Sequence, residues 1–83
     1  MPIVAVMHYL LTNHARQRMS ERSISISEVE FTLSNFFLSI PGDGGGTGLY
    51  ALMPEGDVVI VWVANPLPLQ EPLTIKSVAR RVK

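Results

Sequence analysis

The sequence predicts an α+β domain in which two helices near the N-terminus pack on one face of an antiparallel sheet, in the order β-α-α-β-β-β. Capping signals in the first half predict the helices, and short apolar runs between turn residues in the second half predict the strands. The chain has 83 residues, of which 47% are hydrophobic and 17% charged. This length and composition indicate one globular domain, residues 1–83, with a single core.

The N-terminal part begins with a predicted strand and helix. Ile3–Met7 is short, apolar and rich in β-branched residues, which favours a strand. Thr12 is a good N-cap for a helix over residues 13–22, most of which are good helix formers. One stripe of this helix is expected to face the sheet: Leu11, Ala15 and Met19.

A second helix is predicted over residues 28–37. Ser27 and Glu30 have the spacing of a capping box, and Ile26 and Phe31 have the spacing of a hydrophobic staple. These two start signals agree. The apolar face of this helix is expected to contain Val29, Leu33, Phe36 and Phe37.

The second half of the chain alternates loops with strand candidates. Pro41–Gly48 is rich in glycine, and Asn65–Pro72 contains three prolines, so both are predicted to be loops. Strands are predicted at Leu49–Met53, Asp57–Ala64 and Leu73–Val82, and the turn Pro54–Asp57 joins the first two into a hairpin.

The strand Asp57–Ala64 is apolar on both faces. Alternation places Val58, Ile60 and Trp62 on one face and Val59, Val61 and Val63 on the other. Two short helices cover only one face, so the Pro-rich loop, a second copy or another protein is expected to cover the second. A complex of this kind would bury Val59, Val61 and Val63. The alternative interpretation is the ordinary β-propensity of a central strand.

The formal charge is zero, but it is unevenly distributed. Seven Lys and Arg balance seven Asp and Glu. Residues 1–27 carry +2, residues 28–71 carry −6 without any Lys or Arg, and residues 72–83 carry +4. If the two basic ends converge in space, the domain has a basic surface that its net charge conceals.

The first predicted helix carries a basic stripe with a chemical use. His14, Arg18 and Arg22 follow one another at four-residue intervals and therefore lie on one side of the helix. Arginine binds phosphate oxygens, and histidine exchanges a proton near neutral pH. The three residues are candidate catalytic residues for RNA cleavage without metal. The alternative is structural, with Arg18 paired to Glu21 and Arg22 paired to an acid such as Glu28.

The last strand supplies the second basic cluster. If Leu73 and Ile75 face the helices, regular alternation turns Lys76 and Arg80 away from them. Lys76, Arg80 and Arg81 are candidate nucleic-acid-binding residues. A solubilising C-terminal tail is the alternative interpretation.

The sequence predicts no metal site, no phosphate-binding loop and no membrane-spanning segment. The chain has no cysteine, and its two histidines, His8 and His14, have no carboxylate spaced to join them in a metal site. A strand-like segment follows the glycine-rich loop where a phosphate loop needs a helix, so no cofactor is expected. The longest apolar run is shorter than the roughly 20 residues of a membrane span. No signal peptide is recognised, no membrane partner is expected, and a cytoplasmic location is predicted.

The segment from His14 to Ser25, followed by Glu28, resembles the signature of a family of small bacterial domains known as domain-of-unknown-function family 4258. The matching residues are His14, Arg18, Met19, Arg22, Ile24 and Ser25. Ser23 stands where glycine is usual, at a position where glycine would ease a left-handed helix end. The family is distantly similar to RelE/ParE-type toxins, which implies the same element order, action on RNA without metal in many members, and an antitoxin partner. Their catalytic residues vary, so the resemblance assigns none.

Two hypotheses follow. The first is a metal-independent RNA-cleaving, toxin-like domain that uses the basic stripe and the last strand. The second is a non-catalytic module that binds protein or nucleic acid, either as a dimer or with another partner. The partners to be considered are RNA, an antitoxin, and a second copy that covers the apolar sheet face.

Overall fold

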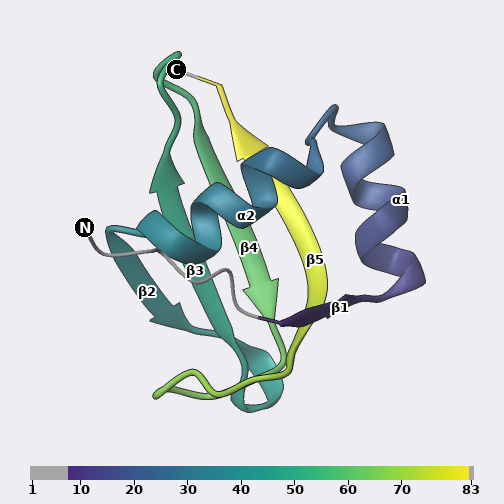
Figure 1. Ribbon diagram of the computed structural model, residues 1–83, viewed down its shortest axis with the longest axis vertical. Helices are drawn as coiled ribbons and strands as arrows, with labels where there is room; N and C mark the ends of the chain where they lie inside the picture. Colours follow the sequence, from purple (N-terminus) through teal and green to yellow (C-terminus); the bar gives the residue numbers. More distant parts are fainter. Residues whose placement is uncertain (1–7, 83) are drawn as a thin grey trace.

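A computed structural model describes residues 8–82 of the chain. Two helices lie against a five-stranded sheet with the strand order β1-β5-β4-β3-β2 (Figure 1). The elements are β1 (Tyr9–Leu11), α1 (Asn13–Glu21), α2 (Ile26–Asn35), β2 (Leu38–Pro41), the short 3-10 helix η1 (Asp43–Gly45), β3 (Thr47–Leu52), β4 (Val58–Val63) and β5 (Leu73–Arg81). The predicted strand Ile3–Met7 lies outside the described residues.

The sheet is mixed, whereas the sequence predicted an antiparallel one. Strand β1 pairs with β5 in parallel, and the other three pairings are antiparallel. Strands β1 and β2 were not predicted, because three and four residues are too few to show an alternating pattern. The α+β class, the two helices and the β3–β4 hairpin are confirmed.

Helix α1 begins where its capping residue predicts. The Thr12 hydroxyl accepts a hydrogen bond from the Ala15 amide at 3.0 Å. Ala15 is fully buried, and Leu11 and Met19 pack against the core. The predicted apolar stripe therefore does face the sheet.

Helix α2 begins two residues earlier than predicted. Its N-cap is Ser25, and the capping box joins Ser25 to Glu28. Glu30, the acid of the predicted box, instead accepts a hydrogen bond from the Tyr9 hydroxyl at 2.8 Å. Because the helix also ends earlier, at Asn35, Phe37 is not on its buried face and its side chain is 63% exposed.

The hydrophobic core lies between the helices and one face of the sheet. Val29 and Leu33 of α2 pack there with the fully buried residues Val59, Val61 and Val63 of β4. The prediction that a partner buries these three valines is wrong, because the chain's own helices cover them. The Pro-rich loop contributes Leu69 to this same core.

A β-bulge interrupts the pairing of β4 with β5. Trp62 pairs with Ser77, but the next residue, Val63, pairs with Ile75, so Lys76 is an extra residue in β5. The extra residue changes the alternation along the strand. Ile75 and Val78 are both buried in the helix-side core although they are three residues apart. The prediction that Arg80 faces away from the helices is wrong for this reason.

Candidate functional site

The face of the sheet opposite the helices is apolar, and no helix of residues 8–82 lies on it. Residues paired across the strands point to the same side, so the pairings define three rows on this face. The rows are Leu38–Tyr50–Ile60–Ala79, Ile40–Gly48–Trp62–Ser77 and Leu52–Val58–Arg81. These residues are called here the open sheet face.

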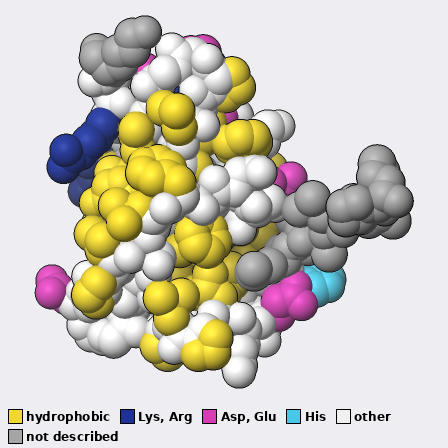
Figure 2. Space-filling view, turned by 90° about the vertical axis from the view of Figure 1, so that its left-hand side faces the viewer, with side chains coloured by type: hydrophobic (Ala, Val, Ile, Leu, Met, Phe, Trp, Pro, Cys, Tyr) yellow, Lys and Arg dark blue, Asp and Glu magenta, His cyan; other side chains and the backbone are white. Residues whose placement is uncertain are grey.

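Several side chains of the open sheet face are accessible to solvent. Leu52 is 57% exposed and Leu38 is 45% exposed, while Tyr50, Val58 and Trp62 are partly buried by their neighbours. Ile60, near the middle of the face, is only 4% exposed. Figure 2 views the molecule from the β2 edge and shows several groups of hydrophobic side chains on this side, with basic side chains at the left margin.

Two glycines leave the space that the Trp62 indole occupies. A Cβ atom on Gly48 would lie 2.6 Å from the indole, and one on Gly42 would lie 3.0 Å from it. The indole therefore rests directly on the backbone of β3 and of the preceding loop. The sequence showed a glycine-rich loop, but nothing in it indicated that these glycines make room for an aromatic ring on the neighbouring strand.

A hollow of about 330 Å³ lies beside the indole, at the end of the open sheet face nearest η1. Its lining consists of Pro41, Gly42, Asp43, Trp62, Lys76 and Ser77. The Lys76 ammonium donates to the backbone carbonyl of Asp43 at 3.4 Å. The bulge in β5 brings Lys76 to this position, so its ammonium borders the hollow beside the Asp43 backbone.

The predicted catalytic residues of α1 are only partly brought together. The Arg18 Nε donates to the His14 Nε2 at 3.3 Å, and the Arg18 guanidinium also pairs with Glu21, as the structural alternative predicted. Hydrogen bonds from Arg18 and Gln17 lower the pKa of Glu21. Arg22 is directed elsewhere, because its Nη1 donates to the Val78 carbonyl of β5 at 2.6 Å. The contact between His14 and Arg18 agrees with their four-residue spacing on one side of the helix.

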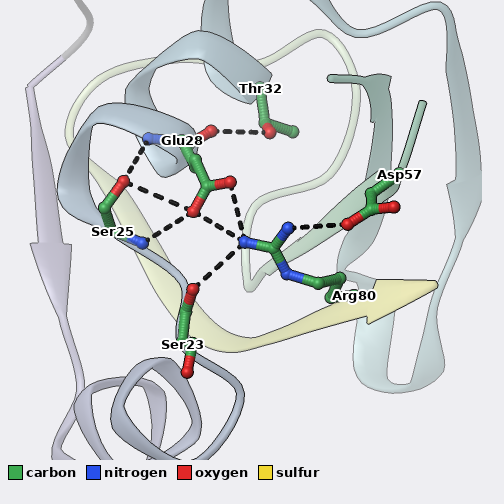
Figure 3. Close-up of polar contacts among 6 residues, drawn as sticks. All are labelled: Ser23, Ser25, Glu28, Thr32, Asp57 and Arg80. Atoms are coloured by element: carbon green, nitrogen blue, oxygen red, sulfur yellow. Dashed lines mark hydrogen bonds and ion pairs between the residues drawn. The ribbon is translucent and has the colours of Figure 1, made fainter. Parts of the chain in front are cut away.

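Arg80 lies at the centre of a polar network on the helix side of the sheet (Figure 3). It donates to both carboxylate oxygens of Glu28 at 2.7 Å, to Asp57 at 3.0 Å and to the Ser23 carbonyl at 3.1 Å. The hydrogen bonds with Glu28 and Asp57 raise the pKa of Arg80. Burial alone would raise the pKa of Glu28, but the Ser25 amide and Arg80 outweigh it and hold that pKa below its usual value.

The basic residues of the chain are thus divided between the two sides of the sheet. Arg80 points to the helices, where its Nη1 and Nη2 donate to carboxylates and a carbonyl, while its buried Nε has no hydrogen-bond partner among the described residues. Lys76 and Arg81 lie on the open side. The structure does not bring the three residues predicted to bind nucleic acid onto one surface. Within residues 8–82 no three His, Asp or Glu side chains are grouped so that they could hold a metal ion.

A family model described as Domain of unknown function (DUF4258) matches residues 11–40. The matched segment covers both helices and nearly all of β2, which confirms the resemblance seen around His14 in this part of the chain. No curated protein and no solved structure is significantly similar to the chain. The similarity to RelE/ParE-type toxins therefore stays a prediction. None of the described helices is long and apolar enough to cross a membrane.

Proposed function

We propose that the chain is a non-catalytic protein-interaction module and that its binding surface is the open sheet face. The observation that carries this proposal is the set of apolar rows on the side of the sheet away from the helices. Leu38 and Leu52 are about half exposed there, and Trp62, in a different row of the same face, is partly buried. The Pro-rich loop, which was one candidate for covering this face, packs its Leu69 on the other side.

The size of this face supports a role in binding. Four strands about 4.8 Å apart and about six residues long, at about 3.3 Å per residue, cover about 400 Å². Large exposed apolar patches on monomeric proteins are often functional. Retaining such a patch on a domain of only 83 residues is consistent with a partner that covers it.

Site-specific photocrosslinking tests this proposal. A photoreactive phenylalanine derivative replaces either Leu52, on the open sheet face, or Gln17, which is exposed on α1. In the cells that express the protein, we expect adducts of defined mass from position 52 and none from position 17. The additional substitution Val58→Lys, in the same row as Leu52, should remove the adducts while circular dichroism shows that the fold is kept. Equal adducts from both positions, or none from either, would contradict the proposal.

One contact favours a second candidate function, the metal-independent cleavage of RNA by a toxin-like domain. The hydrogen bond between Arg18 and His14 places a cation and an imidazole side by side on an exposed helix. Together they provide phosphate binding and one proton-transfer group. Arg18 would have to exchange Glu21 for a phosphate, and a second proton-transfer group is still needed. These requirements make this function the second candidate.

An assay with RNA in the presence of a chelator separates the two functions. If the second candidate is correct, the wild type cleaves RNA, and His14→Ala and Arg18→Ala each lose the activity. Arg16→Ala is the matched control, because Arg16 is an exposed arginine of the same helix that lies outside the stripe. If the wild type does not cleave RNA, or if all the variants cleave it equally, this function is excluded.

A further inference from the structure

We infer that the partner of the open sheet face is a short segment of another protein that is both acidic and apolar, and that one of its carboxylates binds in the hollow beside Trp62. The inference rests on the proposed function, because it requires this face to be an interaction surface. It adds the chemical class of the partner and the place where its charge is recognised. Three features support it: the charges that flank β4, the lining of the hollow and the size of the face.

Two basic side chains flank the apolar rows of the open sheet face. Arg81 pairs with Val58 at the start of β4, and Lys76 is the extra residue beside the pair formed by Trp62 and Ser77, near the end of β4. The stretch of β5 from Lys76 to Arg81 spans at most about 16 Å. A partner that lies along β4 therefore passes a positive charge near each end of the strand.

The acids of the described chain do not neutralise these two charges. In the part of the chain that the structure describes, the ion pairs are formed by Arg18 and Arg80, with acids of the two helices and of the turn between β3 and β4. Neither Lys76 nor Arg81 takes part in an ion pair among these residues. A surface with uncompensated positive charge attracts acidic partners and disfavours basic ones. Charge complementarity therefore favours an acidic segment.

The hollow of about 330 Å³ gives one carboxylate a defined place, because Trp62, Lys76 and Ser77 all line it. The Lys76 ammonium has three N–H donors, and its contact with the Asp43 carbonyl, at 3.4 Å, is longer than an ordinary hydrogen bond. Lys76 therefore retains donors for a carboxylate, and the Ser77 hydroxyl adds another. The Trp62 indole offers an apolar surface to the stem of the same acidic side chain.

Asp43 is the acidic residue among those that line the hollow. Its negative charge opposes the binding of a carboxylate, although its backbone carbonyl contacts the Lys76 ammonium. The inference therefore predicts opposite effects from two neighbouring side chains. Loss of the Lys76 charge should weaken binding, and loss of the Asp43 charge should strengthen it. A partner held by apolar contacts alone would respond to neither substitution.

The size of the face fits a short segment better than a folded domain. A face of about 400 Å² gives a total buried area of about 800 Å², which is below the 1,200–2,000 Å² of standard stable interfaces. Interfaces of this size are typical of weak, transient contacts. The complex is therefore expected to dissociate readily, and high ionic strength should weaken it further because salt screens exposed charges.

Selection from a library of random peptides displayed on phage tests the charge of the partner. The full chain is immobilised at low salt, and the peptides that it retains are sequenced. We expect the wild type to enrich peptides that combine Asp or Glu with apolar residues. The variant that carries both Lys76→Glu and Arg81→Glu should enrich Lys and Arg instead. Arg16→Glu, on the exposed side of α1, is the matched control and should keep the acidic preference.

Two outcomes of this selection overturn the inference. The first is a wild type that shows no enrichment of acidic residues among the retained peptides. The second is a preference that stays the same after both charges are reversed, or that changes equally with Arg16→Glu.

Fluorescence titration locates the bound carboxylate, because Trp62 is the only tryptophan of the chain. The probe is the most strongly enriched peptide, synthesised without tryptophan. We expect Lys76→Gln to weaken its binding about fivefold and Asp43→Asn to strengthen it about twofold. Glu55→Gln, at the exposed turn between β3 and β4, should leave the binding unchanged, and circular dichroism checks the fold of each variant. Equal binding to Lys76→Gln, or weaker binding to Asp43→Asn, overturns the assignment of the hollow.

These outcomes also separate the inference from the proposed function. If photocrosslinking from Leu52 captures a partner but the retained peptides show no acidic preference, the interaction module stands and the acidic segment is excluded. If photocrosslinking also detects no partner at this face, both proposals fail.

Discussion

Arg80 of β5 donates a hydrogen bond to each carboxylate oxygen of Glu28 in the first turn of α2, both at 2.7 Å. The same guanidinium pairs with Asp57 between β3 and β4, and it binds the carbonyl of Ser23 between the two helices. One side chain near the end of the sequence therefore ties together the helix layer and the strand hairpin. The side chains of Arg80 and Glu28 are only 18% and 20% exposed, so solvent does little to replace these contacts.

Removing either partner should destabilise the fold. We expect Arg80→Ala to lower the free energy of unfolding by about 2–4 kcal/mol, because it leaves two carboxylates without their cation in a mostly buried site. Chemical denaturation measures the loss. Arg81→Ala, at the exposed neighbouring position, is the control and should change the stability by less than about 0.5 kcal/mol. Equal effects of the two substitutions would show that the network contributes little.

The same network predicts how stability depends on acid. The pKa of Glu28 in the folded protein lies below its ordinary value of 4.5, so the ionised carboxylate contributes stability above about pH 4.5. This contribution is lost as the pH falls further and the carboxylate is protonated. Urea unfolding between pH 7 and pH 2.5 should show a steeper loss of stability below pH 4.5 in the wild type than in Glu28→Gln. Identical pH profiles would contradict this assignment.

Ser23 provides a stabilising substitution. It has a positive φ of 54°, a left-handed conformation that costs a residue with a Cβ atom about 1 kcal/mol or more. After the entropy of glycine in the unfolded chain is subtracted, Ser23→Gly should stabilise the protein by about 0.5–1 kcal/mol. Ser20→Gly, within α1, should instead destabilise it by a similar amount. Differential scanning calorimetry of the two variants measures both changes in stability. A loss of stability with Ser23→Gly would contradict the prediction.

The contact between Gly48 and Trp62 is testable by a double-mutant cycle. Gly48→Ala should cost about 1–3 kcal/mol, because its Cβ atom would lie 2.6 Å from the indole. In a Trp62→Val background the same substitution should cost much less. Gly48→Ala should also shift the fluorescence emission of the single tryptophan as the indole moves into solvent. Additive effects of the two substitutions would show that the ring does not rest on Gly48.

The start of α2 shows why local signals were not sufficient to place it. The pattern of serine followed three residues later by glutamate occurs twice, at Ser25–Glu28 and at Ser27–Glu30. Both agree with a capping box. The choice is made by tertiary contacts, since Arg80 binds Glu28 and Tyr9 binds Glu30. Helix α1 was predicted at its correct start, and its N-cap Thr12 also donates hydrogen bonds to the Ile75 and Lys76 carbonyls of β5.

A different reason explains why the sequence could not show which face of the sheet the helices cover. The sequence showed that β4 is apolar on both faces, but only the packing shows that the helices cover Val59, Val61 and Val63. The bulge then reverses the expected side of Arg80, which joins a network instead of a basic surface. The sequence placed Val58, Ile60 and Trp62 together on one side of β4, but it did not show that this side would be the one without helices. The contact between His14 and Arg18 follows from helical spacing, whereas the space that the Trp62 indole occupies depends on the pairing of β3 with β4.

The extra residue in β5 also determines which pairing the strand adopts. In most half-exposed strands a slide by one residue is prevented because it would expose the apolar side to water. This sheet is apolar on both sides near β4, so that penalty is small and several alignments of β5 would otherwise compete. Ile75 and Val78 are buried on the same side although their separation is odd, and only a strand with one surplus residue between them satisfies both. The extra residue Lys76 thus fixes the register of β5 against β4. Inserting or deleting a residue in β5 is therefore expected to disturb the pairing more than replacing one residue by another.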